Sequence, residues 1–450
     1  GRGCLGLHSF VLSVTFVRLS APTPGMPLCY FSRSYARILV SRAGRQRTSL
    51  RRDTAYPFRR CTSFRVPLFE GAQRSVNSKS EPDAFLPDIC GIHVMTSSWE
   101  TIEGLDRAYL EYAKGNGDPH RCAQQAIDAD PSCTMAYCVK GLLAALEGLD
   151  PAIVAESLAA AEASLSFSPE EGEEGNVEGG QGAGGARGPW QREQVFVEAL
   201  RAWAFGRFRE GALLLETWLM KVPVDLPALK FAQDAHITLG DGANARDCVA
   251  RVLPYWPKTA AGYPCVLGMH AFGLAETGAY LAAEESADTA LAMGSDNMWA
   301  LHAMSQAYEL EARASEGCSL LTQQHSDWEK GGSLAPRVAW NLGIFQLERG
   351  MNRRAQGTFD RYLCQGEEQR RRQSNKGLGG APPPHASVVD LTDATNLLWR
   401  MDILGVDTGV DRWKGLAEAW HSHETSWHSS TLRDMHALMC YASMAYMPGD

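Results

Sequence analysis

Histidine and carboxylate side chains that could bind a metal ion or move a proton are spread over the second half of the sequence. Imidazole titrates near neutral pH and is a good nitrogen ligand, and a carboxylate beside it can act as a second ligand or as a base. The candidates are Asp234, His236, His270, Glu276, His302, Glu309, Asp390 and His436. Polar residues inside a helical array more often hydrogen-bond to one another, which favours a binding role over catalysis.

Two further motifs have the residue types but lack the surroundings that their chemistry needs. Glu424 and His428 are four residues apart, a spacing that places both on one helix face, but no HExxH pattern accompanies them. The glycine-rich run at 179–182 lacks the strand and helix of a phosphate loop. The sequence therefore predicts no metal, no cofactor and no catalytic residue. The alternative is a metal-dependent or hydrolase-like enzyme that uses the inner-face His, Asp and Glu residues.

The elements that must position these residues follow from a repeat between Gln194 and Pro257. Gly206 and Gly240 are 34 residues apart, and so are Pro223 and Pro257. This is the tetratricopeptide (TPR) period, in which each helix–turn–helix unit buries its apolar face by stacking on a neighbour. We therefore expect residues 98–450 to form an all-α, TPR-like right-handed solenoid of antiparallel helix pairs.

The remaining units flank this pair. Further hairpins are predicted over residues 135–165, 263–292, 299–321 and 338–363, and single helices over 388–404, 411–421 and 430–446. Residues 168–189 and 366–385 are rich in glycine and charged or polar residues and carry few apolar side chains. They are predicted to be flexible insertions.

Residues 1–94 differ in composition from the rest of the chain. They are rich in arginine, serine and proline, and residues 1–52 contain no Asp or Glu. They are either translated upstream sequence before a start at Met95, or an organelle transit peptide that begins at Met26. Both interpretations predict disorder. We expect the protein in the cytoplasm, or in a mitochondrion or plastid if residues 26–94 are a transit peptide.

Composition restricts the class of partner. The formal net charge is −9 and 45% of the residues are hydrophobic. A large core is therefore expected, and the acidic main body disfavours nucleic acid.

The 12 cysteines contain no CxxC pair, which favours reduced thiols in an intracellular compartment. No uncharged apolar run reaches the length of about 18 residues that indicates a membrane span.

Several segments resemble the tetratricopeptide repeat protein 38 family. They include ALKFAQDAHITLG (228–240), GMHAFGLAETGAYLAAE (268–284), WALHAMSQAYE (299–309) and NLGIFQLERG (341–350). The resemblance implies an all-α, TPR-like array whose usual inferred role is protein interaction, with no assigned biochemical activity.

The chain departs from that family's pattern at inner-helix histidines. Gln233, Gln306 and Asn341 stand where the family has histidine, so the resemblance implies that any metal or acid–base centre built on them is dismantled here. We expect a non-catalytic scaffold that binds a segment of another protein on its concave face, and an acidic surface that favours basic ligands. The predicted contact residues are Asp234, His236, His270, Glu276, His302, Glu309, Asn341, Asp390 and His436.

Overall fold

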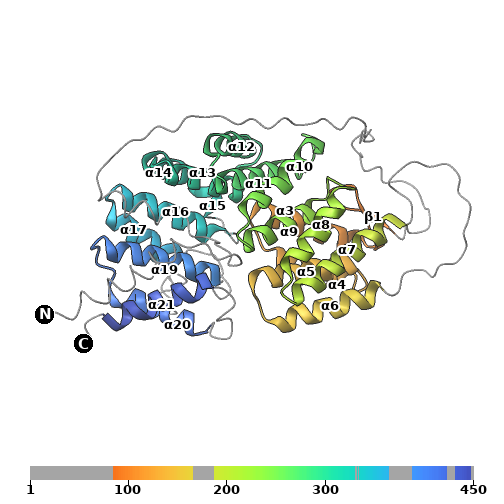
Figure 1. Ribbon diagram of the computed structural model, residues 1–450, viewed down its shortest axis with the longest axis horizontal. Coiled ribbons are helices and arrows are strands. Elements are labelled where there is room, and N and C mark those ends of the chain that lie inside the picture. Colours follow the sequence, from red (N-terminus) through yellow and green to blue (C-terminus); the bar gives the residue numbers. More distant parts are fainter. Residues whose placement is uncertain are drawn as a thin grey trace, which may run out of the picture.

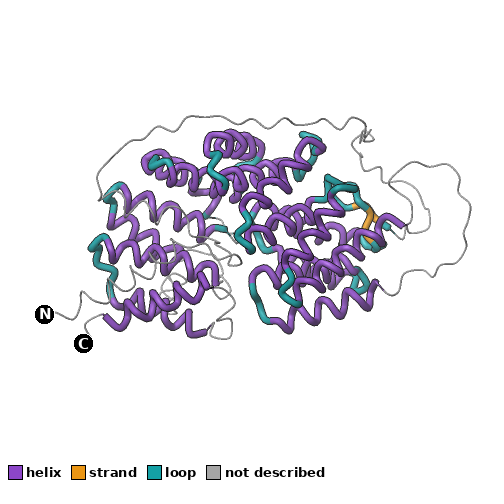
Figure 2. Tube along the Cα trace, in the orientation of Figure 1, coloured by secondary structure: helices purple, strands orange, loops and turns teal. Residues whose placement is uncertain are grey.

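The computed structural model describes residues 85–165, 187–329, 332, 334–363, 388–422 and 431–446. Within these ranges almost all regular structure is helical (Figure 2). The helices follow one another along an arch, with α3 to α9 at one end, α10 to α14 across the top and α16 to α21 at the other end (Figure 1). The predicted all-α, TPR-like solenoid of antiparallel helix pairs is confirmed.

Six pairs form the first part of the arch. They are α3 (Trp99–Lys114) with α4 (Pro119–Ala129), α5 (Thr134–Glu147) with α6 (Pro151–Leu165), α7 (Arg187–Ala204) with α8 (Phe208–Leu219), α9 (Leu226–Thr238) with α10 (Gly242–Val252), α11 (Tyr263–Glu276) with α12 (Tyr280–Met293), and α13 (Met298–Leu310) with α14 (Ala314–Gln323). The short helix η1 (Leu253–Tyr255) follows α10.

The second part has more irregular outer elements. It contains α15 (His325–Trp328), α16 (Ala335–Glu348), α17 (Asn352–Thr358), the π-helical turn η2 (Phe359–Leu363), α19 (Val388–Ile403), α20 (Val410–Ser422) and α21 (Thr431–Tyr446). The first helices of successive units contact one another in the order α11, α13, α16, α19, α21. These five helices are called the inner helices below.

Glycines lie at the turns between the two helices of a pair, at the positions where the sequence predicts these turns. Gly206, Gly240, Gly278 and Gly350 all have positive φ angles, between 70° and 85°. Side chains are strained in this left-handed region and glycine is not. The 34-residue spacing between the first two of these glycines therefore reports two successive hairpins, as predicted.

Small residues allow neighbouring helices to approach closely. A Cβ atom added to Gly273 of α11 would lie 2.6 Å from the Cα atom of Arg246 in α10. Ala199, Ala235 and Ala245 are fully buried between helices in the same way. Buried apolar side chains continue along the whole array in three adjacent groups, so each unit completes its core on its neighbours.

The first described helix, α3, also contacts units that are distant in the sequence. It packs against α9 and α11, and its Tyr112 hydroxyl donates to the carboxylate of Asp234. Lys114 Nζ lies 2.8 Å from Asp296 Oδ2, and the carbonyl of Gly115 accepts from the amide of Leu334 at 3.3 Å. Part of the α9 surface is therefore covered by α3.

The two ends of the arch also approach each other. A Cβ atom added to Gly148, at the turn between α5 and α6, would lie 2.9 Å from Arg433 Nη1 at the beginning of α21. Burial lowers the pKa of Arg433. The final described helix therefore reaches back to the second pair.

Residues 85–94 correct the expected boundary of the N-terminal extension. They were expected to be disordered, but they form a short antiparallel hairpin of β1 (Leu86–Pro87) and β2 (His93–Val94). Leu86 and Val94 belong to the apolar core. The prediction is wrong at these ten residues because a local reading of composition cannot detect contacts with helices far along the chain.

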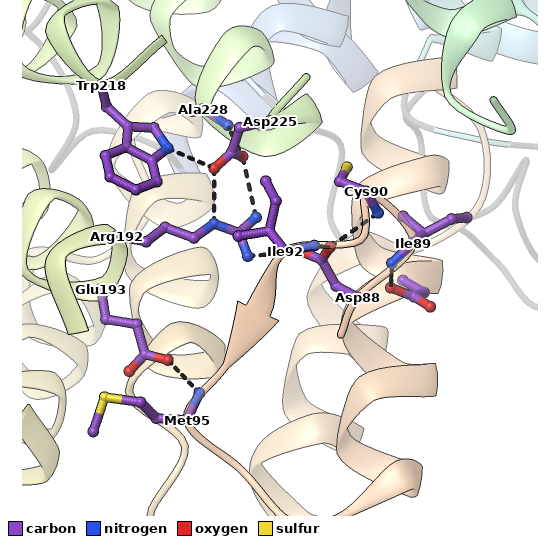
Figure 3. A network of polar contacts seen from close by, with 11 residues as sticks. Asp88, Ile89, Cys90, Ile92, Met95, Arg192, Glu193, Trp218, Asp225 and Ala228 are labelled. Atoms are coloured by element: carbon purple, nitrogen blue, oxygen red, sulfur yellow. Dashed lines mark hydrogen bonds and ion pairs between the residues drawn. The ribbon is translucent and has the colours of Figure 1, made fainter. Parts of the chain in front are cut away.

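A buried ion-pair network anchors this hairpin (Figure 3). Arg192 of α7 donates from Nη1 to Asp88 Oδ2 at 2.7 Å and from Nε to Asp225 Oδ2 at 2.7 Å. Trp218 Nε1 donates to the same Asp225 oxygen at 2.8 Å. Asp225 also caps α9 by accepting from the amide of Ala228. One guanidinium thus joins the hairpin, α7 and the beginning of α9.

Helix α7 begins at Arg187, so the last three residues of the predicted insertion at 168–189 are helical. Residues 1–84, the rest of that insertion and the insertion at 366–385 lie outside the described residues. The eight described cysteines are free thiols. Among the described helices, none combines the length and the apolar character needed to cross a bilayer.

Candidate functional site

Ten polar residues of the inner helices form the candidate site, called the inner polar cluster. They are Glu276 of α11, His302, Gln306 and Glu309 of α13, Arg337 and Asn341 of α16, Asp393, Asn396 and Arg400 of α19, and His436 of α21. Spacings of three, four and seven residues place the members on each helix along one face. The contacts described below join these faces across consecutive helices.

His302 is held in one tautomer. Its Nδ1 atom lies 2.9 Å from Asn341 Oδ1, and because an amide oxygen only accepts, Nδ1 carries the proton and Nε2 has a free lone pair. The ring stacks on Phe272, with centroids 5.6 Å apart. Burial, assisted by the charge of Arg337, lowers the pKa of His302 to about 3. The imidazole is therefore neutral at physiological pH and a weak base.

Arg337 is the electrostatic centre of the cluster. Its Nε atom lies 2.8 Å from Asp393 Oδ2, and its charge also acts on Glu276, His302 and His436. Burial nevertheless raises the pKa of Asp393 to about 7; Arg337 opposes this shift and Asp390 adds to it. One guanidinium thus does not compensate for the lost hydration of the nearby carboxylates.

Arg400 contacts two other members of the cluster, Glu309 and Asn396. Its Nη2 atom is 3.8 Å from Glu309 Oε1, which is an ion pair but too long for a hydrogen bond. Its Nε atom donates to Asn396 Oδ1 at 3.0 Å, and Trp340 Nε1 donates to the same oxygen at 3.1 Å. The Glu309 side chain is 95% buried, so its carboxylate has little access to water.

Apart from Asp393 Oδ2, which lies 2.8 Å from Arg337 Nε, four buried atoms of the cluster have no hydrogen-bond partner among the described residues. They are Gln306 Oε1, Glu309 Oε1, Asn341 Nδ2 and His436 Nε2. The Nδ1 atom of His436 lies 2.8 Å from the carbonyl of Leu432, so Nδ1 donates and Nε2 is an acceptor. Each such unpaired group reduces stability by about 1–3 kcal/mol. A group that reached these four atoms would supply the missing hydrogen bonds.

Three of the predicted contact residues do not join the cluster. The Asp234 carboxylate accepts from Tyr112 and pairs with Lys230. His236 Nε2 lies 2.5 Å from Glu216 Oε1 of α8. His270 is half-buried on α11, where burial and then Arg246 lower its pKa.

The other predicted residues lie in or beside the cluster. Glu276, His302, Glu309, Asn341 and His436 are members, and Asp390 is close enough to raise the pKa of Asp393. Their contact with a partner stays a prediction.

Sequence reasoning missed the basic members of the site. Arg337 and Arg400 were not singled out, although Arg337 precedes Asn341 by one helical turn. Lys230 was also missed, and its ammonium is fully buried 3.9 Å from the ring centroid of Trp299 and 5.0 Å from that of Tyr112. Burial lowers the pKa of Lys230, and Asp234 opposes this shift. Only contacts between distant units reveal these roles.

The described residues contain no group of three or more His, Cys, Asp or Glu side chains arranged to hold a metal ion. Glu424 and His428, which the sequence analysis considered as a pair, lie outside the described residues.

No protein-family model matches the chain. The crystal structure of yeast Tom70 aligns over 76% of this chain and 80% of that chain, with 11% identity and a TM-score of 0.32. The TPR domain of P58(IPK) aligns over 77% of this chain and 90% of that chain, with 11% identity and a TM-score of 0.23. The chain's own helix pairs and turn spacing define its class: it is a TPR-like helical repeat protein.

Proposed function

We propose that this protein is a protein-interaction scaffold of the tetratricopeptide repeat protein 38 type. It holds a segment of a partner protein on the inner helices, around the inner polar cluster. The observation that carries the proposal is the set of four buried polar atoms that make no hydrogen bond, at Gln306, Glu309, Asn341 and His436. A bound segment would supply their missing hydrogen bonds, so binding would remove the free-energy cost of leaving these atoms unpaired.

The binding surface is limited to the later part of the arch. Asp234 already binds Tyr112 of α3 and Lys230, which leaves the carboxylate few positions for a partner. The proposal therefore assigns partner contact to α11, α13, α16, α19 and α21. The cytoplasmic location expected from the sequence remains part of the proposal.

A charge reversal at matched positions tests the proposed surface. Glu276 of α11 is exposed and belongs to the cluster, whereas Glu285 is exposed on the outer helix α12. Glu276→Lys places a cation beside Arg337 and should abolish partner binding. Glu285→Lys makes the same change in charge away from the cluster and should preserve it.

The measurement is affinity capture with the full chain, followed by identification and quantification of the bound proteins. The expected result is at least one protein that the wild type and Glu285→Lys retain equally and Glu276→Lys loses. The proposal fails if every captured protein binds the two variants equally, provided that both variants melt at the wild-type temperature.

A further inference from the structure

We infer that the group that enters the inner polar cluster is the guanidinium of an arginine side chain carried by the partner segment. This inference rests on the proposed function and names the chemistry of its ligand. Three observations support it: the balance of hydrogen-bond donors and acceptors, the balance of charge, and the spacing of two acceptors on α13.

The unpartnered atoms of the cluster are mostly acceptors. Gln306 Oε1 must be an acceptor because the amide nitrogen of the same side chain donates to Glu276 Oε1 at 2.5 Å. Glu309 Oε1 and His436 Nε2 are also acceptors, and Asn341 Nδ2 is the single donor. A group that is to pair with three acceptors must bring several N–H or O–H donors.

The charges of the cluster and its immediate neighbour favour a cation. Glu276, Glu309, Asp390 and Asp393 are four carboxylates, and Arg337 and Arg400 are two guanidiniums. With all groups ionised their sum is −2. An entering cation would therefore be favoured over an anion.

The geometry favours a guanidinium over an ammonium. Gln306 and Glu309 lie three residues apart on α13, so they face the same side of that helix. An ammonium presents three donors from one point, but a guanidinium presents five N–H groups in a planar fork that can bond to two neighbouring acceptors at once. Glu309 is 93% buried and His436 is 97% buried, so both acceptors meet the incoming group with little competing water.

Short capped peptides test the inference on the full chain. The probe is a pentapeptide with one central arginine between alanines, and its counterparts carry lysine, citrulline or glutamate at the centre. Citrulline keeps the shape of arginine and loses the charge. Binding is measured by isothermal titration calorimetry to the wild type, Glu309→Gln and Glu276→Gln, with Glu285→Gln on the outer helix as the control.

The arginine peptide should bind the wild type and Glu285→Gln equally. The lysine, citrulline and glutamate peptides should bind at least about tenfold more weakly, and each cluster variant should weaken the arginine peptide by about tenfold or more. Glu276→Gln keeps the test valid if Glu309→Gln folds poorly, because Glu276 is exposed.

Several outcomes would overturn the inference. They are no binding of the arginine peptide, equal binding of the lysine or citrulline peptide, tighter binding of the glutamate peptide, or no effect of the cluster variants. Any of these results refutes the inference that the ligand is a guanidinium. The scaffold proposal still holds if affinity capture yields a partner that Glu276→Lys loses. If no such partner exists, the scaffold proposal fails as well.

Discussion

The hydroxyl of Tyr112 in α3 donates to the carboxylate of Asp234 in α9, and this joins two helices separated by five others along the chain. Lys230 pairs with the same carboxylate and lies over the Tyr112 ring. Tyr112→Phe keeps the ring and removes the hydroxyl. We expect the free energy of unfolding to fall by about 2 kcal/mol, because a hydrogen bond to a charged group is lost.

Urea unfolding of the full chain measures this change. Tyr255→Phe is the control, since Tyr255 is exposed on η1, and it should alter stability by less than about 0.5 kcal/mol. Equal stability of the two variants would mean that α3 is not fastened to α9 through this contact.

A second prediction concerns the ion-pair network that anchors the β1–β2 hairpin. Asp88→Asn keeps the side-chain size but leaves the fully buried Arg192 with one carboxylate, Asp225, instead of two. Removing one partner from a buried ion pair typically reduces stability by about 3–5 kcal/mol. Asp288→Asn on the exposed surface of α12 should have almost no effect. Chemical denaturation that gives the same midpoint for both variants would contradict the anchoring role.

A third prediction is a pH dependence due to Glu193. Burial raises the pKa of this carboxyl to about 7, although the amide of Met95 donates to it at 2.8 Å. The unfolded chain releases this proton near the ordinary pKa of 4.5, while the folded chain keeps it. Stability therefore falls as the pH rises from about 4.5 to 7, by about 3 kcal/mol from this group.

Glu193→Gln should remove that contribution. The variant should be more stable than the wild type above pH 7, and its stability should depend less on pH between 4.5 and 7. Midpoints of urea unfolding at a series of pH values give the comparison. Parallel pH profiles for the two proteins would show that Glu193 is ionised in the folded state.

A fourth prediction uses two turn glycines with nearly equal φ angles, 68° at Gly148 and 73° at Gly206. Alanine at either position forces a side chain into the left-handed region, which destabilises by about 1 kcal/mol. Only at Gly148 would the new Cβ atom also meet Arg433 Nη1, at 2.9 Å; nothing lies within 4 Å at Gly206. Gly148→Ala should therefore destabilise more.

The difference between these two alanine variants should disappear in an Arg433→Ala background. Double-mutant cycles by thermal or urea unfolding isolate the interaction energy between the substituted position and Arg433. An unchanged difference would mean that Arg433 does not contact the α5–α6 turn in solution.

Local features of the fold were predictable because their signals lie close together in the sequence. Gly206 and Gly240 end their helices with positive φ angles, and the 34-residue period follows from one helix pair. Ala199 and Ala235 mark close helix approaches and are buried. In the candidate site, His302, Gln306 and Glu309 could be placed on one face from their spacing alone.

Other features depend on pairs of residues that no local pattern connects. Asp88 and Arg192 are 104 residues apart, and Tyr112 and Asp234 are 122 residues apart. Composition predicted disorder around Asp88. The residue that anchors it, Arg192, lies on α7, so no local pattern could indicate the contact. The acceptor at His436 Nε2 is equally invisible in the sequence, because it follows from a hydrogen bond that fixes the tautomer.

The packing of α3 against α9 and α11 has a consequence for how the molecule comes apart. In an open repeat array each unit touches only its neighbours, so terminal units fray independently of the middle. Here the first described helix is tied to the fourth and fifth pairs, and loosening it disturbs them too. Amide hydrogens of α3, α9 and α11 should therefore exchange with a common protection factor, as one cooperative block.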